Sequence, residues 1–470
     1  MKKTSKGKVN PEDKVNYLTT AAIPGLVTRM AVPTMISMLV TTFYNLIDTL
    51  FVGKLDNQST GAVGITFSVM AIMQAFGFLF GHGSGNYISR KLGAGETDNA
   101  RKMAATGFFS SLAVGILIAV LGFVFVDPLA KLLGSTDTML PFTRSYMSII
   151  FLGAPFIMGS FVLNNQMRFQ GCAGSSMIGI VTGAVLNTIL DPVLIFVFDL
   201  KVAGAAYATV ISQMVSFIIL LIMNKKMCGI NVRLKDFSFE FSYYKDMFKG
   251  GVPSLCRQSI ASLATICLNI AAGRYAGDMA DAAIAAMSGA AIAAMSVVGR
   301  VAMFANSALI GFGQGFQPVC GTNYGAGKYD RVREAYRFCV KTATVALVIM
   351  SVAGIIFAEP LIRLFRNDPD VIKIGTVTLI AQFAAFVLNA NTVLCNMLMQ
   401  TIGMAFKASV IAMARQGLFF IPLIFILPRI FGLPGVEYCQ AVADVCAFIV
   451  SVPFSISVLK NLGKTAGNPS

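Results

Sequence analysis

Long apolar runs, each bounded by charged residues, proline or glycine, follow one another along the whole chain. One bilayer crossing takes about 20 apolar residues, so each run is long enough for a transmembrane helix. The border between the seventh and eighth runs is the least sharp, because alanine and glycine dominate positions 271–289. The pattern predicts an all-α polytopic membrane protein. Its twelve crossings are expected near 25–52, 60–88, 103–126, 143–166, 175–198, 203–223, 251–272, 284–309, 338–357, 372–398, 409–428 and 435–458.

Composition agrees with this class and excludes a soluble globular protein. Hydrophobic residues make up 56% of the chain and charged residues 13%, and the mean hydropathy is +0.73. A net charge of +15 would suggest nucleic-acid binding in a soluble protein. Here, however, Lys and Arg concentrate in the loops on the side of the membrane where the N-terminus is expected. We expect a multi-pass protein of the cytoplasmic (inner) membrane that contacts lipid and no nucleic acid. Both termini are expected in the cytoplasm, with tails at 1–20 and 461–470.

Residue sets for metal binding or catalysis are missing from the sequence. The nine cysteines are scattered, with no CxxC pair or other metal-ligand spacing, and His82 is the only histidine. There is no HExxH motif and no Ser/His/Asp set. We therefore expect no enzyme activity, no cofactor and no metal, with the thiols and His82 serving as packed residues.

The second half of the chain repeats the first at a nearly constant offset. The matched segments are 81–102 with 311–333, 126–132 with 358–364, and Val32-Pro33 with Val252-Pro253. Six predicted helices separate the matches, and because six is even the two halves share one orientation in the membrane. Such parallel lobes favour a carrier over a channel or receptor. The expected parts are a first lobe at 21–224, a cytoplasmic linker at 225–249 and a second lobe at 250–460.

Two aspartates lie in apolar surroundings of the first lobe, and an ionised carboxylate inside a membrane is costly. Asp48 has Asn45 three residues earlier, and Asp191 has Asn187 four residues earlier, so each acid has an amide on its own helix face. Burial and a nearby second acid both favour protonation of a carboxyl group, which suits a proton or cation site. Alternatively, Asp48 pairs with Lys54 and Asp191 begins a proline kink.

The second lobe carries arginines where the first carries acids. Arg257 and Gln258 lie in the seventh predicted helix, Arg300 in the eighth and Arg415 in the eleventh. An arginine inside a membrane must pair or face water, so these residues either make structural pairs or contact substrate. Asp444, in the twelfth helix, is a natural partner for one of them.

Small residues recur at four-residue spacing on several predicted helices, which allows close helix approach. They are Gly77, Gly81 and Gly85; Gly179 and Gly183; and Ser307, Gly311 and Gly315.

Short motifs occur in a fixed order along these helices. They are Val32-Pro33, Asn45-Leu46-Ile47-Asp48-Thr49, Gly93-Ala94-Gly95, Arg168-Phe169-Gln170-Gly171, Leu186-Asn187, Asp191-Pro192, Val252-Pro253-Ser254, Arg257-Gln258 and Gln400-Thr401-Ile402-Gly403. With twelve helices, they resemble the multidrug and toxic compound extrusion (MATE) family over nearly the whole chain. The resemblance implies a V-shaped pair of pseudo-symmetric six-helix bundles. It also implies that Asp48, Asn187 and Asp191 match the family's first-lobe acidic site, with the Thr209 hydroxyl near it.

The sequence departs from the branch of the family that has a cation site in the second lobe. Acids are absent from the cores of the seventh and tenth helices, and Asn389, Asn391 and Asn396 occupy the tenth-helix region instead. This favours the branch similar to DinF-type and staphylococcal-type multidrug exporters.

We therefore expect a monomeric secondary active efflux transporter that exchanges H⁺ or Na⁺ for amphipathic, often cationic, organic compounds by alternating access. The alternative is a flippase for lipid-linked saccharides, which shares the superfamily fold. The predicted ion-coupling residues are Asn45, Asp48, Asn187, Asp191 and Thr209, and the candidate substrate cavity comprises Arg257, Gln258, Arg300, Asn389 and Arg415.

Overall fold

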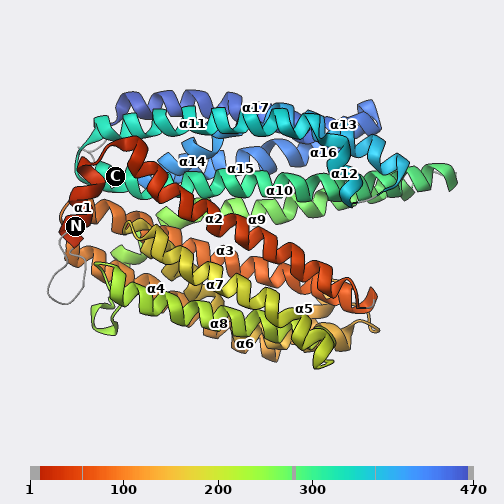
Figure 1. Cartoon of the computed structure of the whole chain (residues 1–470), viewed down its shortest axis with the longest axis horizontal. Helices are drawn as coiled ribbons and strands as arrows, with labels where there is room; N and C mark the ends of the chain where they lie inside the picture. Colours follow the sequence, from red (N-terminus) through yellow and green to blue (C-terminus); the bar gives the residue numbers. More distant parts are fainter. Residues whose placement is uncertain (1–10, 56, 278–281, 366, 464–470) are drawn as a thin grey trace.

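The computed structural model describes residues 11–55, 57–277, 282–365 and 367–463, and every regular element in these ranges is a helix. Figure 1 shows long helices running side by side, with the first and last described residues at the same end. In chain order the helices are α1 Pro11–Thr20, α2 Ile23–Val52, α3 Asn57–Gly93, α4 Thr97–Val124, α5 Val126–Leu132, α6 Leu140–Phe169, α7 Ala173–Pro192, η1 Val193–Val197, α8 Lys201–Met227, η2 Leu234–Asp236, α9 Phe241–Gly277, α10 Ala282–Gly325, α11 Tyr329–Ile356, α12 Ala358–Phe365, α13 Pro369–Phe386, α14 Asn389–Ile402, α15 Ala405–Met413, η3 Ala414–Phe420, α16 Ile421–Phe431 and α17 Leu433–Asn461.

Within the described ranges, eleven helices are long and apolar enough to cross a membrane. The 37-residue α9 adds a twelfth helix of crossing length, although its Ala, Gly and polar residues make it less hydrophobic. The prediction of an all-α membrane protein is confirmed, and the twelve crossings agree with it.

Helix ends differ from the predicted apolar runs in informative ways. α10 continues sixteen residues past position 309, to Gly325, because hydropathy marks the part in lipid and not the whole helix. The tenth predicted helix is two helices, α13 and α14, separated at Val387 and Leu388. Residues 11–20, expected as a tail, form helix α1, and α9 begins within the expected linker. The remaining tail residues, 1–10 and 464–470, lie outside the described residues.

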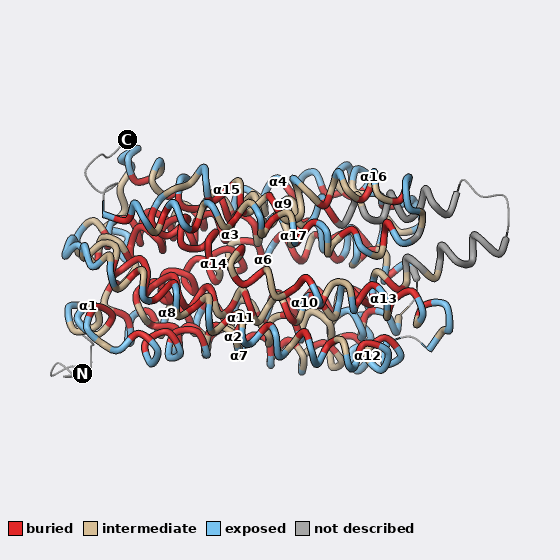
Figure 2. Tube along the Cα trace, turned by 90° about the horizontal axis from the view of Figure 1, so that it is seen from above, coloured by how far each residue is buried: buried red, intermediate tan, exposed pale blue. Residues whose placement is uncertain are grey.

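Two large hydrophobic cores fill the molecule, the first made by the first half of the chain and the second mainly by the second half. The first joins residues of α3, α4, α6 and α8, including Phe108, Phe151 and Val162. The second joins α10, α11, α13 and α14, including Phe316 and Phe386. Figure 2 shows the buried positions most densely in the end of the molecule that holds both termini.

The first half of α2 belongs to the core of the opposite half. Ile23, Leu26, Val27, Met30 and Ala31 pack with the second-half residues of that core. A Cβ built on Gly315 of α10 would overlap the backbone of Ala31, and one on Gly311 would overlap that of Met35. The predicted small face of the eighth crossing therefore brings α10 into backbone contact with α2.

The small faces of the second and fifth crossings also make close helix contacts. Gly77, Gly81 and Gly85 of α3 face residues of α6 at the same four-residue spacing, and a Cβ on Gly85 would overlap the ring of Phe169. Gly179 and Gly183 of α7 face Leu220 and Ser216 of α8 in the same way. These three predicted interfaces are present.

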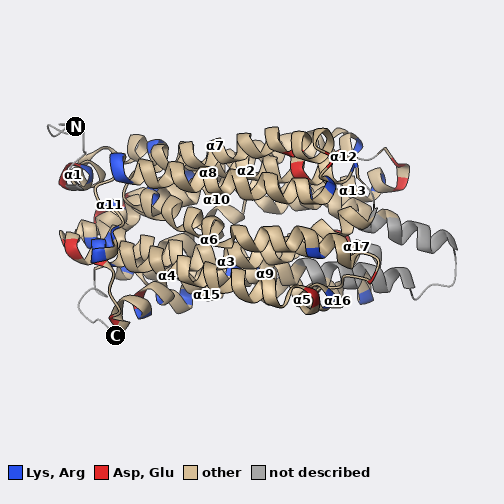
Figure 3. Cartoon of the chain, turned by 90° about the horizontal axis from the view of Figure 1, so that it is seen from below, with Lys and Arg blue, Asp and Glu red and all other residues tan. Residues whose placement is uncertain are grey.

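Charged side chains gather at the two ends of the helices, and few lie between them (Figure 3). Because unpaired charges are costly in lipid, the few inner ones mark candidate functional positions.

Candidate ion and substrate site

The first-half site is built around Asp191, whose side chain is 0% exposed. Its Oδ1 accepts a hydrogen bond from Asn187 Nδ2 at 3.3 Å, and the same amide lies 3.5 Å from Thr209 Oγ1 of α8. The helical i, i+4 spacing sets the first contact, as the sequence predicts. Asn187, Asp191 and Thr209 therefore form one buried polar cluster, as predicted from the sequence and the family resemblance.

The helix changes form directly after this acid. Pro192 has no N–H for the carbonyl four residues earlier, and α7 passes into the π-helical turn η1 at Val193. Single π turns widen a helix and are frequent at functional sites. The change of helix form that the alternative interpretation expects at Pro192 is present, directly beside the Asp191 contact with Asn187.

Asp48 of α2 faces this cluster from the neighbouring helix. Its charge lies within electrostatic range of Asp191, and its Oδ1 is buried without a hydrogen-bond partner. Lys54, the alternative partner, lies over the ring of Phe51 at 5.9 Å, and the described ion pairs do not include it with Asp48. The described hydrogen bonds also include none between the Asn45 and Asp48 side chains. Asp48 is therefore a less constrained acid than Asp191.

Three further residues of the site were not predicted from the sequence. The Tyr44 side chain of α2 lies near Gln213 of α8, and the Tyr146 side chain of α6 lies near Thr209. Tyr44 precedes Asp48 by four residues and Gln213 follows Thr209 by four. The same-face spacing that identified Asn187 could therefore have identified both.

A narrow cavity of about 60 Å³ opens beside the cluster, room for a few water molecules. Its polar lining consists of hydroxyl and amide groups, and none of its lining residues is charged. The lining includes Ser37, Thr41, Tyr44, Gln74, Asn164, Asn187, Thr209, Ser212 and Gln213. Water or a small cation fits this space, whereas a drug-sized molecule requires the cavity to widen.

Several buried oxygens of the site have no described hydrogen-bond partner. Asp48 Oδ1, Asp191 Oδ2 and Asn187 Oδ1 are all buried without a described partner. Carboxylate, amide and hydroxyl oxygens suit a proton or a hard cation such as Na⁺. Within the described ranges, no group of three or more His, Cys, Asp or Glu residues could hold a metal ion. The arrangement can therefore take up a proton or a small cation.

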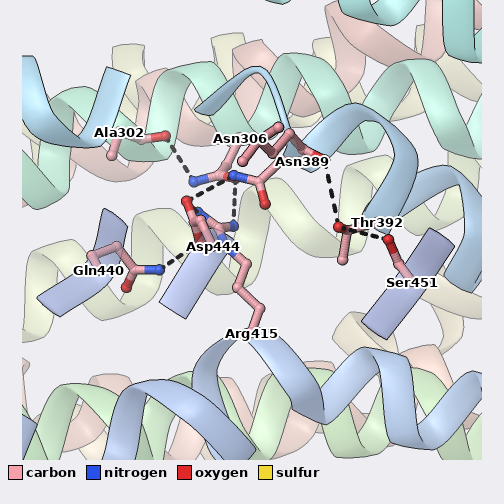
Figure 4. Close-up of polar contacts among 9 residues, drawn as sticks. Ala302, Asn306, Asn389, Thr392, Arg415, Gln440, Asp444 and Ser451 are labelled. Atoms are coloured by element: carbon pink, nitrogen blue, oxygen red, sulfur yellow. Dashed lines mark hydrogen bonds and ion pairs between the residues drawn. The ribbon is translucent and has the colours of Figure 1, made fainter. Parts of the chain in front are cut away.

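The second half also has a buried acid, but its charge is already matched (Figure 4). Asp444 of α17 is 0% exposed and accepts from Arg415 Nε at 2.7 Å. Gln440 and Asn389 also donate to Asp444, at 2.8 and 2.9 Å. Arg415 lies in the π-helical turn η3 and donates to Asn306 Oδ1 at 2.8 Å. Asp444 is thus the structural partner of one arginine, as the sequence suggested.

The other predicted cavity residues lie apart from this pair. Arg257 donates to Asn396 Oδ1 at 3.3 Å, and Gln258 donates to Gln74 of α3 at 3.2 Å, which joins the two halves. Arg300 is exposed on α10. The structure therefore does not bring the five predicted cavity residues together: Asn389 and Arg415 meet at Asp444, while Arg257, Gln258 and Arg300 do not.

Two repeated helical halves, one of which holds buried acids that the described ion pairs do not include, define a polytopic membrane transporter. The chain belongs to the MatE family, whose model matches residues 33–193 and 274–426.

Known proteins resemble the chain over almost its entire length. It is 28% identical over 441 residues to "Multidrug export protein MepA" of Staphylococcus aureus (strain MSSA476), covering 93% of this chain and 94% of that one. The protein of the same name from Staphylococcus haemolyticus is 28% identical, covering 96% and 97%. Among solved structures, "Outward-facing conformation of a multidrug resistance MATE family transporter of the MOP superfamily" matches with a TM-score of 0.89 and 25% identity, covering 99% and 100%.

Proposed function

We propose that this chain is a secondary active multidrug exporter of the cytoplasmic membrane, with H⁺ or Na⁺ coupled through Asp191, Asp48, Asn187 and Thr209. Its substrates are amphipathic, often cationic, organic compounds. It works as a monomer with both termini in the cytoplasm. The lobes at 21–224 and 250–460 rock about the linker at 225–249. The observation that carries the proposal is the set of three buried oxygens without partners beside a solvent-sized cavity.

Exchange follows from competition for the same negative charge. Each bound proton or Na⁺ neutralises one of the two carboxylates, Asp191 or Asp48, and a cationic substrate does the same when the cavity widens. Because two cations at one buried site repel each other, binding of one favours release of the other. The Asn187 amide stays hydrogen-bonded through the cycle, since it can serve as donor or acceptor to either form of the acid.

The printed names of the relatives support the transport of drugs, because multidrug export is the activity named for both staphylococcal proteins. The position of the contacts between the halves supports alternating access. α3 packs closely on α9 and α10 near the end with the termini, where a Cβ on Gly93 would overlap the backbone of Thr322. We infer that the cytoplasmic side is closed in this structure.

The lipid-linked saccharide alternative is less well supported. A pyrophosphate needs several free cations, and Arg415, one of three predicted, is held by Asp444. Only Arg257 and Arg300 of the three predicted arginines are then left to bind the pyrophosphate of such a substrate.

Transport in proteoliposomes tests the proposal. Purified protein is reconstituted, and ethidium movement is followed after imposing a pH gradient or a Na⁺ gradient separately. We expect one gradient to drive ethidium against its concentration and the other to have little effect, and protein-free vesicles control for leakage. Failure of both gradients to drive transport by well-folded protein would contradict ion coupling.

A further inference from the structure

A chain of buried polar side chains joins the two halves of the molecule, apart from both acidic sites. His82 of α3 and Arg168 of α6 belong to the first half. Ser254 of α9, Gln314 of α10 and Gln400 of α14 belong to the second. Each of these five side chains is 1% exposed. Polar groups this deeply buried need matched partners, so their donors and acceptors define the contact.

Arg168 makes the first link between the halves. Its Nη1 donates to Gln314 Oε1 at 2.5 Å, and its Nη2 donates to Asn165 Oδ1 at 2.6 Å and to His82 Nε2 at 3.0 Å. All three acceptors are neutral, and the described ion pairs do not include Arg168.

His82 makes the second link. Its Nδ1 lies 2.9 Å from Ser254 Oγ. Gln400 Nε2 donates to the same hydroxyl at 2.7 Å and to the Gly250 carbonyl at 2.9 Å. The ring is stacked on Phe78 at 5.0 Å and meets Phe169 edge-on at 6.2 Å, so it has no room to turn away.

The chemistry of the partners fixes the form of the imidazole. A guanidinium can only donate, so His82 Nε2 must be the nitrogen with the lone pair. Nδ1 then carries the ring proton and donates to Ser254 Oγ. The closed contact therefore requires a neutral His82.

A second proton on His82 would break this contact. It would point an N–H at the Arg168 guanidinium and place two positive charges about 3 Å apart in a buried region. Around the ring, α6 presents Arg168, and α9 presents Arg257 within electrostatic range. α10 and α14 present only neutral amides here, through Gln314 and Gln400. Among the described contacts, no carboxylate meets His82, Arg168 or Arg257.

The backbones of α3 and α9 approach each other closely at this level. A Cβ on Gly83 would overlap the Met247 carbonyl, and one on Gly251 would overlap the Leu79 carbonyl. α3 and α9 therefore touch directly here, and His82 is 1% exposed while they do.

We propose that His82 is a proton-sensitive latch: the neutral imidazole holds the two halves together on the side of the termini, and its protonation releases them. An imidazole in water takes up a proton near pH 6.5. Below that value, each pH unit lowers the ratio of closed to open molecules about tenfold, because one proton binds only to the open form. The role of the latch in transport rests on the proposed carrier function, but the latch itself is testable without transport.

Histidine-labelled protein gives a direct test. His82 is the only histidine, so ¹⁵N-histidine NMR of the full chain in nanodiscs, purified with a histidine-free tag, reports this ring alone. At pH 8 we expect a neutral ring with its proton on Nδ1, and an imidazolium signal growing below about pH 6.5. A proton on Nε2 at pH 8 would overturn the proposal.

Hydrogen exchange tests the release. Peptides covering 79–86 and 250–258 are followed at pH 7.5 and 5.5, with peptides from α17 correcting for the intrinsic pH dependence of exchange. We expect at least a fivefold acceleration at pH 5.5 in the unmodified chain and less than twofold in His82→Gln, whose amide can accept and donate but cannot take up a proton. Equal responses in both proteins would overturn the proposal. If His82→Gln fails to fold, segments that open at pH 5.5 while the NMR signal stays neutral would overturn it equally. Ethidium transport by the same samples reports separately on the proposed function.

Discussion

The two buried acidic sites of this transporter have opposite electrostatic designs. In the first half, Asp191 and Asp48 lie beside an uncharged cavity, the described ion pairs include neither acid, and several oxygens lack partners. In the second half, Asp444 is bound by Arg415, Asn389 and Gln440. Each site adjoins a π-helical turn with a proline near it, so the two halves share this local backbone conformation.

The difference shows how a repeated fold can separate two tasks. A carboxylate with a permanent guanidinium partner has no charge left for a mobile ion, and it stabilises one arrangement of helices. A carboxylate with neutral partners must bind a proton or cation to remain buried. The first site therefore suits exchange and the second suits structure.

The strongest test of this contrast is Asp191→Asn. The amide keeps the size of the side chain but cannot carry an exchangeable proton or a negative charge, so we expect gradient-driven ethidium transport to fall at least tenfold. Asp199→Asn is a matched control, since Asp199 is exposed beyond the same helix. Normal transport by Asp191→Asn would remove the coupling role from this residue.

The second test removes one partner of the structural pair. Arg415→Met leaves Asp444 as an uncompensated buried charge, which costs about 3–5 kcal/mol of stability. The double variant Arg415→Met/Asp444→Leu removes both charges and is expected to be clearly more stable than the single variant. Thermal unfolding in detergent measures both, and equal losses would show that the two residues act independently.

Asp48→Asn is expected to give a smaller effect than Asp191→Asn. Asp48 is only partly buried and lacks the fixed amide contact of Asp191. We expect a few-fold loss of transport in the same vesicle assay, with Asp191 still coupled. A loss as complete as that of Asp191→Asn would make the two acids equal partners.

The smallest effect is expected at equivalent loops of the two halves, where the repeat aligns Glu96 with Lys328. The hydrogen bond from Lys91 lowers the pKa of Glu96. The pair therefore stabilises the folded protein fully at pH values above the ordinary carboxyl pKa, and this stabilisation is lost as the pH falls through the lowered pKa. Because the pair is exposed, Glu96→Gln should cost at most about 1 kcal/mol at pH 7. Lys328→Gln should cost more, since Lys328 donates to the Thr19 carbonyl of α1 at 3.1 Å. Unfolding midpoints at pH 7 compare them, and the reverse order would contradict the assignment.

The fold could be predicted from the sequence because lipid imposes simple rules. Apolar length located the crossings, and four-residue glycine spacing located three helix interfaces. The break between α13 and α14 could not be predicted, because no proline or glycine marks Val387 and Leu388.

The site was predictable where partners share a helix and unpredictable where they do not. Asn187 and Asp191 follow from i, i+4 spacing, and the Arg415–Asp444 pair follows from the cost of unpaired charge. The contacts of Gln258 with Gln74 and of His82 with Ser254 join residues far apart in the chain. No spacing rule predicts contacts between residues so far apart in the chain. The sequence therefore did not predict the contact of His82 with Ser254, and His82 was expected to be a packed residue.

The division of α2 between the two halves has a consequence for biosynthesis. Its first turns pack into the second-half core, while Tyr44 and Asp48, near its other end, serve the first-half site. Because α2 precedes α10 in the chain, it cannot complete its packing until α10 has been made. We expect the first half, inserted alone, to leave this surface of α2 without its partner in the membrane, so that the packing of α2 is completed only after the second half is inserted.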